Sequence, residues 1–198
     1  MSMTGWLETE GTANDVVVSE QVAYVAAGAE GLRVVDVSDP SLPVEVSEVP
    51  AADARAVAVM GDIAFLANGS AGLLGIRFNP DLSWAETCTS FTPSVALDVA
   101  LTDEYAFAVD ADFGLIVVDR VPLNMLTAVG GVDTPGTASA IALAGDYAYI
   151  ADGAGGLRII DISDPLAPFE AGSYPTAGAA VDVAVAGNLV LIAVEGMG

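Results

Sequence analysis

The 198-residue chain contains no histidine, no lysine and a single cysteine, Cys88. Without histidine there is no Ser-His-Asp or Cys-His machinery and no imidazole metal ligand, and without lysine there is no Schiff base and no phosphate-loop lysine. One cysteine cannot form an intrachain disulfide, and we interpret Cys88 as a small buried hydrophobic residue. The sequence therefore excludes the most common nucleophilic and imidazole-metal chemistries.

Positive charge is also scarce, because five arginines face 27 aspartates and glutamates and the formal net charge is −22. Affinity for nucleic acid backbones comes from Lys and Arg that displace condensed counterions, so DNA and RNA are not expected partners. Cations are the natural small partners of such a chain. The acidity itself fits either a saline habitat or GC-rich codon usage.

Long apolar runs are missing as well. Hydrophobic residues make up 54% of the sequence, yet none of their runs approaches the roughly 20 residues that span a bilayer. The start, "MSMTGWLETE", has no basic segment followed by an apolar one, so these residues show no signal peptide. We expect one domain with a substantial core and no membrane insertion.

The clearest positive feature is an internal repeat of about 42 residues. One marker is the large side chain of the motif "AYVAAG", and a Gly-Leu pair keeps the same period. The first marker occurs at Tyr24, Phe65, Phe107, Tyr149 and Leu191. The Gly-Leu pairs begin at Gly31, Gly72, Gly114 and Gly156. Two markers in phase predict a repeat architecture, with units at residues 13–53, 54–94, 95–137, 138–178 and, in part, 179–198.

Each period contains four short β-rich runs separated by turn signals such as "SDP" and "GAGG". A unit of this size with four antiparallel strands corresponds to one propeller blade. The sequence predicts an all-β fold, a β-propeller of about five blades, with the fifth blade split between the termini or incomplete. Residues 4–12 are predicted as an N-terminal outer strand.

The stretches "LRVVDVSDP" and "LRIIDISDP" resemble the motif of the LVIVD-repeat β-propeller family. The resemblance covers nearly the whole chain, but "LLGIRFNPD" and "LIVVDRVPL" depart from the motif in the second and third units. It implies a bacterial or archaeal protein in a cell-surface or extracellular, secreted context. It implies no particular reaction.

Acidic and polar residues recur in the loops that a propeller places on its upper rim. Carboxylates are ligands that Ca²⁺ prefers, and the densest group predicts a calcium site formed by Asp110, Asp112 and Asp152. The alternative is that these residues cap turns in a strongly acidic chain. The other predicted rim residues are Asp15, Glu30, Asn68, Asp98, Phe113, Asp182 and Glu195.

The functional expectation is a non-catalytic binding or scaffold module that engages a protein, a glycan or a cation through this rim. One alternative is a carboxylate enzyme similar to glycoside hydrolases, with a pair such as Asp98 and Asp110 about 5 to 9.5 Å apart. A purely structural spacer or assembly unit is another. The repeat arithmetic favours an excerpt of a longer chain, and otherwise predicts homo-oligomers formed through the incomplete fifth blade.

Overall fold

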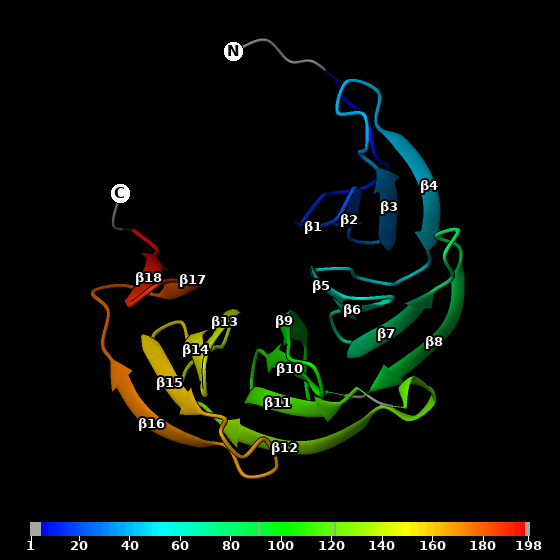
Figure 1. The fold of residues 1–198 in the computed structure, drawn as a ribbon. Coiled ribbons are helices and arrows are strands. Elements are labelled where there is room, and N and C mark those ends of the chain that lie inside the picture. The colour runs from blue at the N-terminus through cyan, green and yellow to red at the C-terminus, as the bar shows by residue number, and fades with distance from the viewer. Residues whose placement is uncertain (1–4, 91, 121, 197–198) are drawn as a thin grey trace.

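The computed structural model is an open arc of five antiparallel β-sheets that surround a central channel as propeller blades do (Figure 1). The structure describes residues 5–90, 92–120 and 122–196. Four sheets have four strands and the last has two. The described residues contain one short 3₁₀-helix, η1 (Leu123–Met125), and no helix with the length and apolar character to cross a membrane. The predicted all-β propeller is confirmed.

Each blade is built from consecutive strands that run outward from the channel. The first blade contains β1 (Asp15–Ser19), β2 (Val22–Ala26), β3 (Leu32–Asp36) and β4 (Val44–Val49). The second contains β5 (Ala56–Met60), β6 (Ile63–Ala67), β7 (Leu73–Phe78) and β8 (Trp84–Ser90).

The third blade contains β9 (Ala96–Leu101), β10 (Tyr105–Asp110), β11 (Gly114–Asp119) and β12 (Thr127–Asp133). The fourth contains β13 (Ala140–Ala144), β14 (Tyr147–Ala151), β15 (Leu157–Asp161) and β16 (Phe169–Tyr174). The fifth consists of β17 (Ala180–Ala186) and β18 (Leu189–Val194).

The "SDP" turns form as the sequence predicts. The Asp36 carboxylate accepts a hydrogen bond from the Ser38 backbone N–H at 2.8 Å, and Asp161 accepts the equivalent bond from Ser163 at 2.9 Å. Hydrogen bonds to the charged form lower the pKa of both carboxyl groups. These aspartates therefore serve the turn after the third strand, which explains why they recur.

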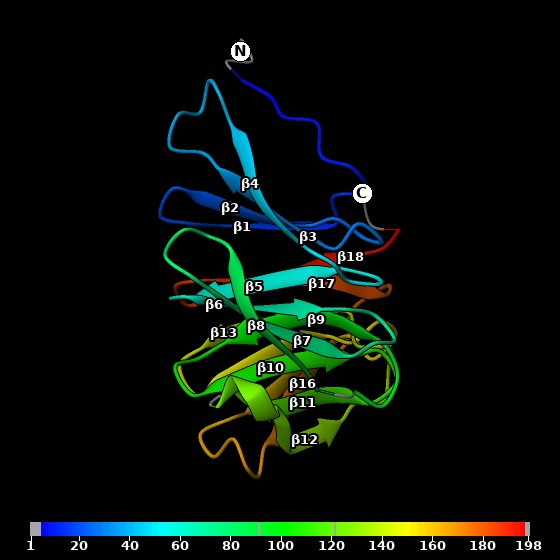
Figure 2. The same ribbon diagram turned by 90° about the vertical axis from the view of Figure 1, so that its right-hand side faces the viewer.

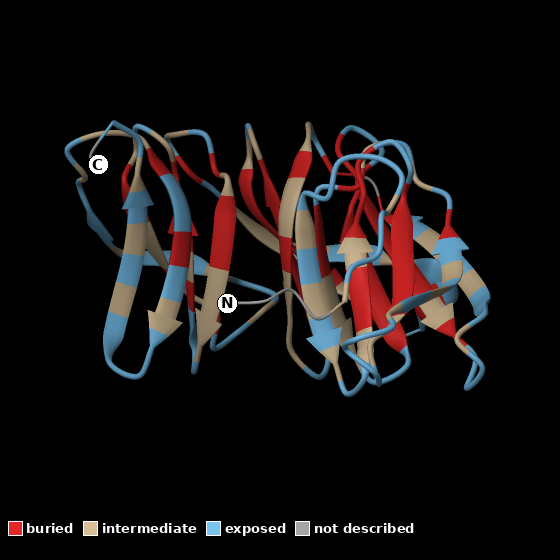
Figure 3. Cartoon of the chain, turned by 90° about the horizontal axis from the view of Figure 1, so that it is seen from above, coloured by how far each residue is buried: buried red, intermediate tan, exposed pale blue. Residues whose placement is uncertain are grey.

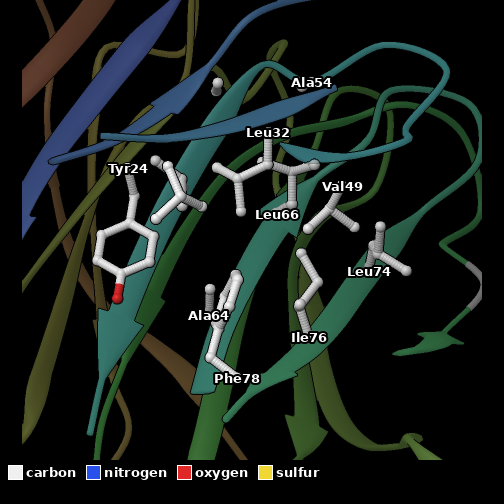
Figure 4. Packing of buried hydrophobic residues seen from close by; sticks show 12 residues of the cluster. Tyr24, Leu32, Val49, Ala54, Ala64, Leu66, Leu74, Ile76 and Phe78 are labelled. Atoms are coloured by element: carbon white, nitrogen blue, oxygen red, sulfur yellow. The ribbon is translucent and has the colours of Figure 1, made fainter. Parts of the chain in front are cut away.

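The core lies between blades rather than within one sheet, because neighbouring sheets pack face to face and the three middle sheets are covered on both faces. Figure 4 shows the cluster between the first two blades, where Tyr24 of β2 faces Phe78 of β7. Their ring centroids are 5.6 Å apart in an edge-to-face arrangement. Viewed from above, buried segments occupy the interior strands while the loops of both rims are exposed (Figure 3). Cys88 differs from its prediction: it lies on an outer strand, β8, and is only partly buried.

Within the part of the chain that the structure describes, the two ends of the arc are not joined to each other. The N-terminal segment runs along the side of the first blade that faces away from the second (Figures 1 and 2). Glu10 of this segment approaches Arg33 of β3 to 3.8 Å, and Gly5 lies against the backbone of Pro40 and Ser41. Over its described part, residues 5–12, the predicted outer strand 4–12 forms no strand. It follows the first blade and does not pair with β18, whose only ladder is with β17.

Candidate functional site

A polar hollow of about 500 Å³ lies at the channel mouth, where the loops that enter the inner strands converge. Four different blades contribute to it, so the hollow exists only because the blades are arranged around the channel. Its lining residues are Thr12, Asn14, Gly28, Asp53, Arg55, Leu97 and Ser139.

Backbone hydrogen bonds between blades hold this mouth in place. Gly28 and Ala54 form a two-residue antiparallel bridge from the β2–β3 loop to the next blade, and the Asn14 side-chain amide donates to the Ala54 carbonyl at 2.7 Å. Two further bridges, Gly69 with Ala96 and Gly153 with Ala180, repeat the contact around the arc. The loops are therefore positioned by the neighbouring blade and not by their own blade alone.

Arg55 is the one basic side chain of the hollow. Its Nε donates to the Asp53 carboxylate at 2.8 Å, and both side chains are about two-fifths exposed. Among the described residues, its two terminal nitrogens have no hydrogen-bond partner. Arg55 thus presents a fixed guanidinium fork to a ligand carboxylate, carbonyl or hydroxyl.

Three inner-strand carboxylates share the channel with this hollow: Asp15, Asp98 and Asp182. The pKa of Asp98 is raised to about 6. Burial is the main cause and the negative charges of Asp15 and Asp182 add to it, whereas the hydrogen bonds from the Ile141 and Val99 amides act in the opposite direction. All three lie at or near the start of an inner strand.

The model of the LVIVD repeat matches residues 10–50, 94–121, 135–176 and 177–198, which is more than half of the chain. The chain belongs to the LVIVD repeat family. No curated protein sequence matches it significantly.

Solved structures similar to this LVIVD chain are propellers of low sequence identity. A functionally unknown protein from Desulfotomaculum acetoxidans DSM 771 matches with a TM-score of 0.78 and 14% identity over 96% of this chain and 65% of that one. The computationally designed Ika8 protein matches with a TM-score of 0.73 and 10% identity over 91% of this chain and 54% of that one. U3-55K matches with a TM-score of 0.71 and 14% identity over 89% of this chain and 56% of that one. The chain therefore spans little more than half to two thirds of these proteins, and the likeness shows the fold alone.

The predicted calcium ligands of the LVIVD chain are not brought together. Asp110 is fully buried and accepts hydrogen bonds from the backbone N–H groups of Ser94, Asp112 and Phe113. Asp112 accepts the Ser94 hydroxyl at 2.7 Å. Across the described residues, no group of three or more His, Cys, Asp or Glu side chains is placed to hold a metal ion.

Asp152, the third predicted ligand, occupies the equivalent place one blade further on. It is also fully buried, and accepts the Thr134 hydroxyl at 2.7 Å, the Gly136 N–H at 2.9 Å and the Arg158 Nε–H at 3.2 Å. Asn68 serves the second blade in the same way through the Asp53 N–H. In the second, third and fourth blades these residues fasten the loop between the second and third strands to the segment that leads into the inner strand, as the turn-capping alternative describes.

The other predicted rim residues lie outside the hollow. Glu30 is exposed and pairs with Arg33 at 3.5 Å, and Glu195 is exposed beyond β18. Phe113 is half-buried and lines a separate apolar hollow of about 410 Å³, with Gly130 and Gly131 of the outer strand β12.

Sequence reasoning missed Arg55, Asp53 and Ser139. The available signal was that one position at the start of the inner strands varies from blade to blade. It is the position just before Asp15 and its equivalents in the other blades, and it reads Asn14, Arg55, Leu97, Ser139 and Val181. A position that varies on an otherwise regular scaffold is where a repeat protein places recognition.

Proposed function

We propose that this LVIVD-repeat chain is a non-catalytic binding module that engages a polar ligand, a peptide chain or a glycan, at the upper channel mouth. The observation that carries this proposal is the polar hollow formed by four blades around Arg55. Its hydroxyl, amide, carboxylate and guanidinium groups provide donors and acceptors at fixed positions, as binding sites require.

Two features favour binding over hydrolysis. A glycoside hydrolase needs one carboxyl group as acid and another as base or nucleophile, both facing the substrate. Asp98 and Asp110, the pair suggested by the sequence, are each engaged by backbone N–H groups, and Asp110 is fully buried. In addition, none of the described residues that line the hollow is aromatic, so they offer no ring for a sugar to stack on.

The proposed location is extracellular or at the cell surface, as the family resemblance implies. Fractionation of the source cells, with protease accessibility of the intact cells as readout, tests it. Protection of the chain in intact cells and its recovery with the soluble intracellular fraction would contradict this part of the proposal.

The binding proposal is tested with peptide and glycan panels applied to the native chain and to Arg55→Ala. A bound ligand should lose affinity at least about tenfold when the guanidinium is removed, which corresponds to about 1.4 kcal/mol. Arg77→Ala is the matched control, because Arg77 is similarly exposed but pairs with Asp62 and Glu86 outside the hollow. Binding that survives Arg55→Ala, or falls equally in both variants, would contradict the assignment of the mouth.

A further inference from the structure

Carboxylates join the inner strands of consecutive blades. The Asp15 side chain accepts the N–H of Val16 in its own strand at 2.8 Å and the N–H of Val57 in the second blade at 2.9 Å. Asp98 accepts the N–H of Val99 at 2.7 Å and that of Ile141 in the fourth blade at 2.8 Å. One carboxylate therefore binds two inner strands together. We call this arrangement a clamp, and the position of Asp15 and its equivalents in the other blades the clamp position.

The clamp position alternates between aspartate and alanine. From the first blade to the fifth it reads Asp15, Ala56, Asp98, Ala140 and Asp182. In a blade with aspartate at this position, the aspartate accepts the N–H of the residue that follows it. In a blade with alanine at this position, the N–H of the following residue is donated to the aspartate of the preceding blade. Two carboxylates never face each other across the four blade interfaces.

The last clamp is half used. Asp182 accepts the N–H of Val183 through Oδ1 at 2.8 Å. Among the described residues its Oδ2 has no hydrogen-bond partner, whereas the Oδ2 atoms of Asp15 and Asp98 each accept the amide of the next blade. The side chain of Asp182 lies on an exposed part of β17.

Beside this carboxylate, the fifth blade exposes an apolar face. Leu189 and Leu191 of β18 are 65% and 55% exposed, while Val190 and Ile192, which point the other way, pack on the fourth blade. In β14, Tyr149 occupies the place of Leu191 and packs on the following blade. The exposed residues thus occupy positions that bury a blade interface elsewhere in this chain, and Figure 1 shows β17 and β18 at the end of the arc, beside its open part.

We propose that this face of the fifth blade is an interface for a further propeller blade that has alanine, or a similarly small residue, at the clamp position. The incoming blade donates the N–H of its next residue to Asp182 Oδ2 and covers Leu189 and Leu191. The contact continues the interfaces already made between the first and second blades and between the third and fourth.

The pattern argues against a second copy of this chain as the occupant. The first blade of a second copy would bring Asp15 to the interface, and its Val16 N–H is already bound by Asp15 itself. Two carboxylates would then meet with one amide between them, and like charges that share a site repel each other. The first blade also carries its own N-terminal segment, with Glu10 near Arg33, on the face concerned.

The test extends the chain after Gly198 with a copy of residues 157–196, which gives the fifth blade a third and a fourth strand and adds the first two strands of a sixth blade. One version has alanine at the copied clamp position and the other has the aspartate of the original. With alanine there, Asp182→Asn should raise the equilibrium constant for unfolding in urea about tenfold or more, because a charged acceptor is lost. In the extended chain with aspartate at the copied clamp position, and in the unextended chain, Asp182→Asn should raise the equilibrium constant for unfolding less than about threefold. The reason is that the asparagine oxygen still accepts the Val183 N–H. Equal sensitivity in the three chains would overturn the proposal.

A second measurement needs no extension and covers the case in which the extended chains do not fold. Asp182→Ala gives the fifth blade the alanine that precedes an aspartate blade at two interfaces of the arc, so the first blade of a second copy now fits it. At high salt, where the repulsion of the net charge is screened, the N-terminal segment of the second copy has only to move aside, and this variant should self-associate in sedimentation at least tenfold more tightly than the native chain. Asp164→Ala, the same charge change in an exposed lower loop, should behave as the native chain does. If Asp182→Ala associates no more tightly than the control, the alternating clamp does not decide what docks on this face.

Discussion

Asp98 makes the stability of the fold depend on pH in a direction unusual for a carboxyl group. Its pKa is about 6 in the folded chain, above the ordinary value of 3.8, because burial outweighs two hydrogen bonds. Between these pH values the folded state binds more protons than the unfolded state, so the free energy of unfolding falls as pH rises through this window. Asp98→Asn removes this titration.

We therefore expect the native chain to lose on the order of 2 kcal/mol relative to Asp98→Asn as pH rises from about 4 to above 6. Urea denaturation of both proteins across this range measures the difference, and the titrations of the other carboxylates cancel between them. Parallel pH curves for the two proteins would show that Asp98 titrates normally.

Asp152 illustrates the opposite use of a buried carboxylate. It neutralises Arg158 and caps the loop that begins near Thr134. Asp152→Ala leaves the Arg158 Nε, the Thr134 hydroxyl and the Gly136 N–H without their acceptor, although Glu170 still pairs with the Arg158 Nη1, and it should lower the free energy of unfolding by about 3 to 5 kcal/mol. The matched change Asp164→Ala, in an exposed turn where the aspartate accepts only the Leu166 N–H at 3.1 Å, should cost less than about 1 kcal/mol. Chemical denaturation of both variants checks the ranking, which a loss of similar size at the two positions would contradict.

At the scale of the element, glycines determine how closely the third strand can follow the loop before it. Gly156 has a φ of +78°, and a Cβ there would lie 2.5 Å from the Tyr174 carbonyl oxygen. Gly145, in the β13–β14 turn, has a φ of +57° with no atom within 4 Å of such a Cβ. Gly145→Ala should cost about 1 to 2 kcal/mol, the penalty of a left-handed backbone. Gly156→Ala should cost at least about 2 kcal/mol more, since the backbone must also move. Thermal or urea melts of the two variants separate the terms, and equal costs would mean that the overlap is relieved without strain.

Elements were predictable from the sequence because the information that specifies them is local and is repeated. The "SDP" turn needs only Asp36 and Ser38, and the period places Tyr24 in the second strand before any contact is known. The role of Asp110 was not predictable in this way. Its partner Ser94 lies 16 residues earlier and meets it only after the loop has closed on the inner strand. Arg55 was missed for a different reason: a search for recurring positions overlooks a residue that occurs once.

At the scale of the whole molecule, the arc is a stack of interfaces rather than a single core. Each of the four apolar clusters belongs to a pair of neighbouring blades. In such repeat structures, stability is approximately the sum of the contributions of the repeats and of their nearest-neighbour contacts. A blade covered on both sides is consequently more stable than a blade at an end of the arc. The net charge of −22 adds a uniform repulsion that salt screens, and this repulsion does not favour one blade over another.

This arrangement predicts a gradient of amide hydrogen exchange along the arc. The third blade, packed on both faces, should show the slowest exchange, and the fifth blade the fastest among the strands, because β17 and β18 have one packed face and β18 is an edge strand. Exchange followed by mass spectrometry of peptides from β10–β11 and β17–β18 measures the difference. The amides of the β10–β11 peptides should be protected at least about tenfold more than those of the β17–β18 peptides, which corresponds to a difference of about 1.4 kcal/mol in the free energy of local opening. If the β17–β18 peptides are protected as well as those of the third blade, the exposed face of the fifth blade is covered in solution. The native chain would then be an assembly rather than an open arc.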